Sequence, residues 1–238
     1  MIKKQPLRQL YTNPALIIYE HWGITCTRSK PHRLRHAAIN KQRSKEFGLA
    51  SRTAKCLRQL LAPVIPNNKS REMINRFNKR LYAWVMQLPE TNNSTIKEAK
   101  DLIHFQFNGD GSITSRLRIP LAVELNQQAG ITLNIPAMQP QQSIAAPANT
   151  HMVKWKIMAA VCNRQNLSIA DTYSAELTMP YNSDLLLPKK IQLPIPLPAT
   201  MLTSLVIGLE YHLLKNGGLF PVEDKNWQSC GIVGAWWR

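Results

Sequence analysis

The residues best suited to metal or nucleophilic chemistry are scattered through this chain. His32 and His36 are four residues apart, a spacing that would place two metal ligands on one helical face, but Pro31 and the basic neighbours disfavour a preformed cation site. The four cysteines contain no CxxC pair, so we predict reduced thiols and neither a zinc knuckle nor a redox motif; they are Cys26, Cys56, Cys162 and Cys230. We therefore expect no metal and no cofactor.

Signatures of catalysis are also missing from the sequence. It contains no GxSxG, no HExxH and no Gly-rich loop that ends in Lys. Acidic residues after residue 100 are few and dispersed, which disfavours chemistry by paired carboxylates. Gly109-Asp110-Gly111 and Gly217-Gly218 are better explained as hairpin turns. We expect a protein that is not an enzyme.

Positive charge is concentrated in the first part of the chain. Residues 1–100 contain 20 Lys or Arg and 5 Asp or Glu, whereas residues 101–238 contain 10 and 9. The excess is densest from Arg28 to Arg80, with 15 basic and 2 acidic residues. Such asymmetry between two parts of a chain indicates a polyanionic partner.

Eight basic residues form the candidate polyanion-binding site. Pro31 stops a helix, so the segment from Arg28 to His36 is interpreted as an extended basic arm, and a helical period follows it. Lys and Arg contact phosphates and release condensed counterions, which favours binding to nucleic acid. We predict such contacts from Arg28, Lys30, Arg33 and Arg35 in the arm and from Lys41, Lys45, Arg52 and Lys55 on the helix. An acidic protein partner and a merely solvated face are the alternatives.

The elements that position these residues can be predicted from periodicity. Alternation over residues 15–28 predicts a β-hairpin. A helical stripe starting near Ile39 predicts a first helix, and a second begins at Ser70, which is suited to an N-cap. The apolar stripes are Phe47, Ala50, Ala54, Leu57 and Leu61 on the first helix, and Met73, Phe77, Leu81, Trp84 and Leu88 on the second. The two helices are expected to form a helical hairpin with these stripes facing each other.

After residue 100 the pattern becomes that of β-strands. Candidate strands are residues 102–107, 121–125, 131–135, 153–162, 172–178, 202–213 and 230–236. Turn residues separate them, notably Asn216-Gly217-Gly218, and the Pro-rich pieces 136–147 and 188–198 are expected to be loops or edge crossings. Several short strands separated by turn residues predict an antiparallel β-sandwich.

The fold class expected overall is α+β. Residues 1–92 are predicted to form a basic module of β-hairpin, arm and helical hairpin, and residues 101–238 a C-terminal antiparallel β-sandwich domain. The uncharged window from Ile191 to Leu209 approaches the length of a membrane span, but Pro194, Pro196 and Pro198 argue for an extended segment instead. We predict no membrane span and a cytoplasmic location.

Four segments resemble a bacterial protein family found mainly in Bacteroidota. They are Tyr19-Glu20-His21-Trp22-Gly23, the RSKP element Arg28-Ser29-Lys30-Pro31, the segment Phe47-Gly48-Leu49-Ala50-Ser51-Arg52 with its FGxAS-like element, and Leu57-Arg58-Gln59-Leu60-Leu61-Ala62-Pro63. The resemblance covers about the first 90 residues, and the family shares a basic hairpin and helix module with a β-rich C-terminal part. It has no established activity, so the resemblance implies a bacterial source and a non-enzymatic role and assigns no residue.

Two functional hypotheses follow from the sequence. The first is a non-catalytic protein whose basic N-terminal module contacts DNA or RNA phosphates with little sequence specificity. The second is a structural or assembly subunit that forms a homo-oligomer or docks on an acidic protein, for which the Pro-rich apolar stretches of the second part argue.

Overall fold

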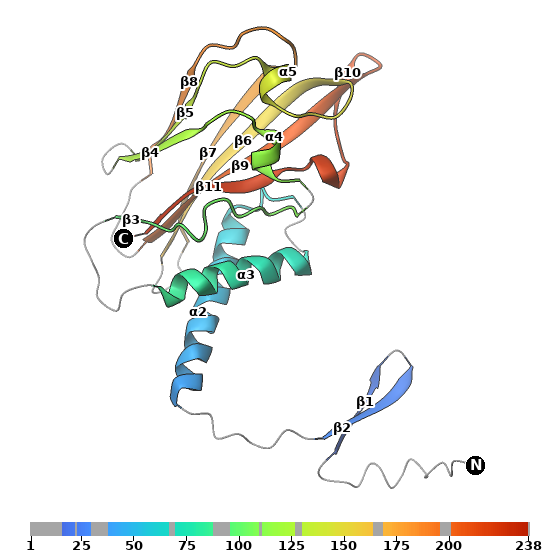
Figure 1. Cartoon of the computed structure of the whole chain (residues 1–238), viewed down its shortest axis with the longest axis vertical. Helices are drawn as coiled ribbons and strands as arrows, with labels where there is room; N and C mark the ends of the chain where they lie inside the picture. The colour runs from blue at the N-terminus through green and yellow to red at the C-terminus, as the bar shows by residue number, and fades with distance from the viewer. Residues whose placement is uncertain are drawn as a thin grey trace. The chain divides into compact units, whose positions relative to one another are not determined.

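A computed structural model describes residues 16–21, 23–29, 38–66, 70–87, 96–109, 111–126, 130–163, 169–195 and 201–237 of the 238-residue chain (Figure 1). The chain divides into two compact units, Met1–Arg43 and Ser44–Arg238. The sequence analysis instead predicts two domains, residues 1–92 and 101–238, and this division stays a prediction.

The first unit contains an antiparallel strand pair. β1 (Leu16–His21) pairs with β2 (Ile24–Ser29) in a register that joins Leu16 to Ser29 and His21 to Ile24. Gly23 has a φ of 73°, a backbone conformation that glycine adopts without steric cost, and it lies in the turn between the strands. The strand pair expected at residues 15–28 is confirmed.

Two long helices follow. α2 spans Ala38–Leu60 and α3 spans Arg71–Met86. The Ser70 side chain accepts a hydrogen bond from the backbone N–H of Met73 (3.4 Å), which satisfies one of the free donors of the first turn, as expected for an N-cap. The apolar stripes are largely buried, but Phe47 is 52% exposed and contacts the Tyr82 ring of α3 edge-to-face.

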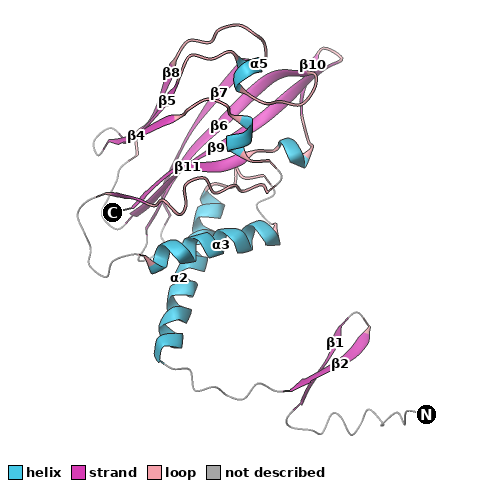
Figure 2. Ribbon diagram, in the orientation of Figure 1, coloured by secondary structure: helices cyan, strands magenta, loops and turns pink. Residues whose placement is uncertain are grey.

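The strands of the second unit form two antiparallel sheets (Figure 2). The larger sheet has the order β3-β11-β9-β6-β7, with β10 paired to β9. Its strands are β3 (Lys97–Glu98), β6 (Thr150–Asn163), β7 (Ile169–Pro180), β9 (Met201–Lys215), β10 (Gly218–Pro221) and β11 (Cys230–Trp237). The smaller sheet has the order β4-β5-β8, formed by β4 (Ala122–Asn126), β5 (Gly130–Ile135) and β8 (Lys189–Leu193). β6 and β9 lie at the centre and pair from Thr150 to Asn163 of β6 and from Met201 to Leu213 of β9.

The central strands bury side chains on both faces of the larger sheet. Odd-numbered β6 residues such as Trp155 and Ile157 share a cluster with Ile131 and Leu133 of the smaller sheet. Even-numbered residues such as Ala160 share a second cluster with both helices. Because side chains alternate across a strand, this two-sided burial requires the near-continuous apolar runs of β6 and β9. Figure 1 shows the resulting layers, with α2 and α3 on one side of the larger sheet and β4, β5 and β8 on the other.

Two local expectations were wrong. Residues 102–107 form turns with a single bridge, Gln106 to Gly231, because His104 adopts a φ of 67° that interrupts an extended strand. Leu102, Phe105 and Phe107 are buried all the same, which explains the apolar pattern. Conversely, the Pro-rich piece 188–198 contains β8, which pairs with β5 along five residues.

Short helices also occur at α4 (Ile113–Arg116), α5 (Pro140–Ser143) and the 3₁₀ turn η1 (Lys225–Trp227).

The α+β class is confirmed as an N-terminal strand pair, two long helices and an antiparallel, sheet-rich C-terminal part. The expected helical hairpin was wrong: Figure 1 shows α3 crossing α2 instead of running antiparallel beside it. The apolar stripes of both helices pack into one cluster with the larger sheet, and the helices touch each other through the rings of Phe47 and Tyr82. Among the described residues, no helix has the length and apolar character needed to cross a membrane.

Candidate nucleic-acid interface

The eight predicted site residues fall into three groups. Arg28 lies exposed on β2, with its guanidinium carbon 5.7 Å from the centre of the Tyr19 ring. Lys30, Arg33 and Arg35 lie outside the described residues. The last four, Lys41, Lys45, Arg52 and Lys55, are all exposed on α2; Lys41 belongs to the first compact unit and the other three to the second.

We call Lys45, Arg52 and Lys55 the α2 basic stripe. At about 100° per residue, they fall within an arc of about 80° on the helix, and they extend over about 15 Å of its length. Ala50, Ala54 and Leu57 lie on the opposite side and are fully buried against the larger sheet. Packing of one face therefore holds the three cations outward on the other.

Among the residues that the structure describes, no carboxylate neutralises the stripe. Among the described residues, none of its three side chains forms an ion pair; the Arg52 Nε donates to the backbone oxygen of Gly48 (3.3 Å). Lysines of the sheet behave differently, since Lys154 pairs with Glu176 (2.7 Å) and Lys156 pairs with Glu210. The difference leaves the charge of the stripe available to an anionic partner.

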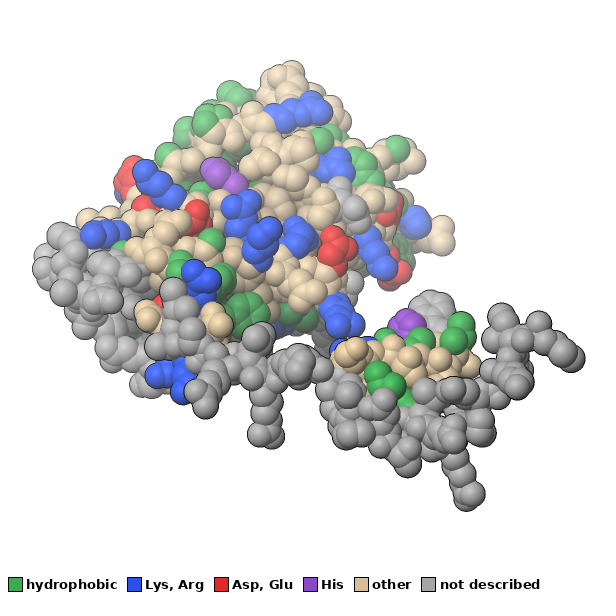
Figure 3. Space-filling view, turned by 60° about the horizontal axis from the view of Figure 1, so that its bottom comes forward, with side chains coloured by type: hydrophobic (Ala, Val, Ile, Leu, Met, Phe, Trp, Pro, Cys, Tyr) green, Lys and Arg blue, Asp and Glu red, His purple; other side chains and the backbone are tan. Residues whose placement is uncertain are grey.

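The second helix adds exposed cations that the sequence interpretation did not include in the site. Arg71, Lys79 and Arg80 are exposed on α3, and the helical period that revealed the stripe would also have found them. Figure 3 shows Lys and Arg side chains spread over a face of the molecule that includes the helices. Over the described residues 44–66 and 70–87 there are eight Lys or Arg and two Glu.

Arg76 of α3 has a structural role instead. Its Nη1 donates to the backbone oxygen of Gln106 (3.1 Å) and its Nη2 to that of Phe107 (3.4 Å), while the guanidinium carbon lies 5.6 Å from the centre of the Phe105 ring. These contacts satisfy carbonyls of the irregular segment that covers the sheet beside α3. Arg76 is therefore excluded from the candidate interface.

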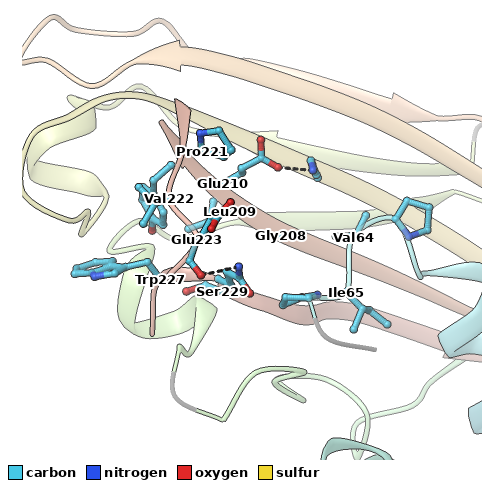
Figure 4. Close-up of a pocket in the computed structure, with 15 residues that line it drawn as sticks. Val64, Ile65, Gly208, Leu209, Glu210, Pro221, Val222, Glu223, Trp227 and Ser229 are labelled. Atoms are coloured by element: carbon cyan, nitrogen blue, oxygen red, sulfur yellow. Dashed lines mark hydrogen bonds and ion pairs between the residues drawn. The ribbon is translucent and has the colours of Figure 1, made fainter. Parts of the chain in front are cut away.

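A cavity of about 360 Å³ lies beside the sheet, within the second unit (Figure 4). The chain between α2 and α3 forms one wall with Val64 and Ile65, β9 forms the floor, and residues 221–229 close the other side. Val64 packs directly over Gly208, since a Cβ at this position would lie 2.8 Å from Val64 Cγ1. At the floor, the Glu210 carboxylate pairs with Lys156.

Glu210 is the centre of that charge network. It pairs with Lys156 of β6 and, through Oε1, with the His212 Nε2 at 2.8 Å. Burial acts to raise the pKa of Glu210, but the hydrogen bond and charge of Lys156, together with His212, hold this pKa below its usual value. The ionised carboxylate of Glu210 on β9 thus bridges to Lys156 on the neighbouring strand β6.

Comparisons of the whole chain with protein-family models, with curated proteins and with solved structures gave no match. Function is therefore inferred from the residues and their geometry.

Proposed function

We propose that this chain is a non-catalytic protein that binds nucleic acid through phosphate contacts made by the α2 basic stripe, with little sequence specificity. One observation carries the proposal: Lys45, Arg52 and Lys55 are exposed along one side of a helix whose other side is buried, and none has a carboxylate partner among the described residues. The arm residues Arg28, Lys30, Arg33 and Arg35, and Lys41, belong to the proposal as further contacts.

The physical basis is counterion release. Each phosphate neutralised by Lys or Arg on duplex DNA lowers the slope of log K against log salt by about 0.9, and on single strands by about 0.7. Phosphate contacts position a protein without reading bases, so a stripe made only of Lys and Arg supports weak sequence preference. Arg52 has part of its guanidinium held by Gly48, which fixes its direction before binding.

The β-rich part is proposed to be an antiparallel sandwich that serves as a rigid support for α2. The shared cluster between the two sheets supports this view, and so does the burial of the helix stripes on the larger sheet. The resemblance to the Bacteroidota family is consistent with a bacterial, non-enzymatic protein and remains part of the proposal.

Fluorescence anisotropy with labelled oligonucleotides tests the proposed function. The full chain, freed of nucleic acid by nuclease and high salt, is titrated into two duplexes of unrelated sequence and into one single-stranded RNA at low salt. We expect binding to all of them, with affinities for the two duplexes within a few-fold of each other. Absence of binding at low salt, or strong preference for one duplex, contradicts the proposal.

A second function, assembly with copies of itself or with an acidic protein, is favoured by one separate observation. Large apolar side chains are exposed on the β-rich part: Leu185 (63%), Leu187 (80%), Leu214 (53%), Leu219 (41%) and Phe220 (51%). Exposed apolar patches mark interaction surfaces. Light scattering on the nuclease-treated chain separates the two functions, because assembly requires a defined oligomer without nucleic acid, whereas phosphate binding is compatible with a monomer.

A further inference from the structure

Two cysteines meet across the interface between α2 and the larger sheet. The Cys162 Sγ on β6 lies 3.1 Å from the Cys56 Sγ on α2 and donates a hydrogen bond to it, although the residues are 106 positions apart in the sequence. A disulfide has a sulfur–sulfur distance of about 2.0 Å, so an approach of about 1 Å would join them. Both side chains are buried in the cluster that packs the helices on the sheet.

We propose that Cys56 and Cys162 form a site of reversible disulfide formation that locks α2 onto the central strand β6. This inference is independent of nucleic-acid binding and goes beyond it. The other two cysteines are placed differently. Cys230 is fully buried in the same cluster but has no sulfur contact among the described residues, and Cys26 lies on β2 of the first compact unit.

The reaction partner is a low-molecular-weight disulfide such as oxidised glutathione. The Cys56 thiolate attacks one glutathione sulfur, the sulfur–sulfur bond of glutathione breaks, and the glutathione thiolate that leaves takes up the proton lost by Cys56. Cys162 then attacks the Cys56 sulfur of this mixed disulfide and releases the second glutathione, which takes up the Cys162 proton. Two protein thiols are thereby oxidised, and one glutathione disulfide is reduced to two thiols.

The order of attack follows from the two environments. Cys56 is 7% exposed and Cys162 is fully buried, so Cys56 is the thiol that a small oxidant reaches first. Burial raises the pKa of the Cys162 thiol, and its hydrogen bond to Cys56 adds to this, which keeps it protonated in the folded chain. Reaction therefore requires local opening of α2, and it should accelerate in urea concentrations too low to unfold the chain.

Peptide mapping tests the proposal. The full chain is incubated in a glutathione redox buffer, with and without low urea, then alkylated, digested and analysed by mass spectrometry without reduction. We expect the peptide containing Cys56 joined to the peptide containing Cys162, at their summed mass less two hydrogen atoms, and faster joining in low urea. Because the link closes a long loop, the oxidised chain should also unfold at a temperature higher by roughly 5–15 °C, and a reductant should reverse this.

Single substitutions supply the controls. Cys230→Ala should leave the link and the rise in unfolding temperature intact, whereas Cys56→Ala and Cys162→Ala should each abolish both. Mapping of the unsubstituted chain decides the question even if a variant fails to fold. Recovery of Cys56 and Cys162 as alkylated free thiols after prolonged oxidation, or a dominant link through Cys230 or Cys26, overturns the proposal.

Discussion

The indole ring of Trp84 on α3 meets that of Trp237 on β11 edge-to-face, with the ring centres 6.4 Å apart. Trp84 is 3% exposed and Trp237 is 8% exposed. The Lys97 Nζ of the adjacent edge strand β3 lies 5.6 Å from the centre of the Trp237 ring. The pair thus joins α3 to β11, beside the edge strand of the larger sheet.

Replacing Trp84 with Ala should destabilise the chain by about 3–5 kcal/mol, because the substitution removes a buried aromatic side chain and leaves a cavity. Urea unfolding followed by far-UV circular dichroism measures this. Met86→Ala, two residues along the same helix at a side chain 49% exposed, is the matched control and should change the free energy of unfolding by less than about 1 kcal/mol. Equal losses in the two variants would contradict the packing described for α3.

Two glycines with similar backbones should respond differently to Ala. Gly130 and Gly217 have φ values of 83° and 79°, so each substitution carries a backbone strain of about 1–2 kcal/mol. A Cβ on Gly217 meets nothing within 4 Å, whereas a Cβ on Gly130 collides with the backbone oxygen of Leu193. We expect Gly130→Ala to be the more destabilising, since β8 must move away from β5. Similar unfolding midpoints for the two variants would contradict the observed pairing of β5 with β8.

Glu210 makes the stability of the chain sensitive to acid. Because its pKa is lowered in the folded state, its contribution is present at pH values above the usual carboxyl pKa of 4.5 and is lost as the pH falls through the lower, folded value. Glu210→Gln should therefore cost about 1 kcal/mol at neutral pH, and the difference from the unsubstituted chain should shrink below pH 4.5. Urea unfolding at pH 7 and pH 3 measures both quantities.

The control for this substitution is Glu223→Gln. Glu223 is exposed and has no ion pair among the described residues, so its replacement should have little effect at either pH. A loss for Glu210→Gln that stays constant from pH 7 to pH 3 would show that the ion pairs of Glu210 do not stabilise β6 and β9.

Local signals in the sequence predicted much of the fold. Ser70 begins α3 because a side-chain oxygen can satisfy a free N–H, and Asn216-Gly217 turns β9 into β10 because both residues accept a positive φ. Residues 102–107 misled the prediction, since buried residues there pack from irregular turns rather than from alternate positions of a strand. β8 was missed because its flanking prolines indicate a loop, whereas pairing with β5 determines the conformation.

In the candidate site, too, features set by neighbouring residues could be predicted from the sequence, whereas contacts between distant segments could not. Exposure of Lys45, Arg52 and Lys55 follows from the helical period, so the sequence was sufficient to find the stripe. The contact between Cys56 and Cys162 depends on how α2 lies across β6, and no spacing of cysteines indicates it. Packing of α2 and α3 on the larger sheet could not be predicted either, because an apolar helix stripe does not specify which surface covers it.

The central claim, that the α2 basic stripe contacts phosphates, is tested most directly by the salt dependence of binding to duplex DNA. The slope of log K against log salt is compared for the unsubstituted chain, for Lys45→Gln/Arg52→Gln/Lys55→Gln, and for the control Lys189→Gln/Lys190→Gln/Lys215→Gln, which removes three exposed cations from β8 and β9. We expect the stripe variant to have a slope shallower by up to about 2.7, at about 0.9 for each phosphate that is no longer neutralised, and the control variant to keep the original slope. An unchanged slope in the stripe variant, or an equal decrease in both variants, would contradict the claim.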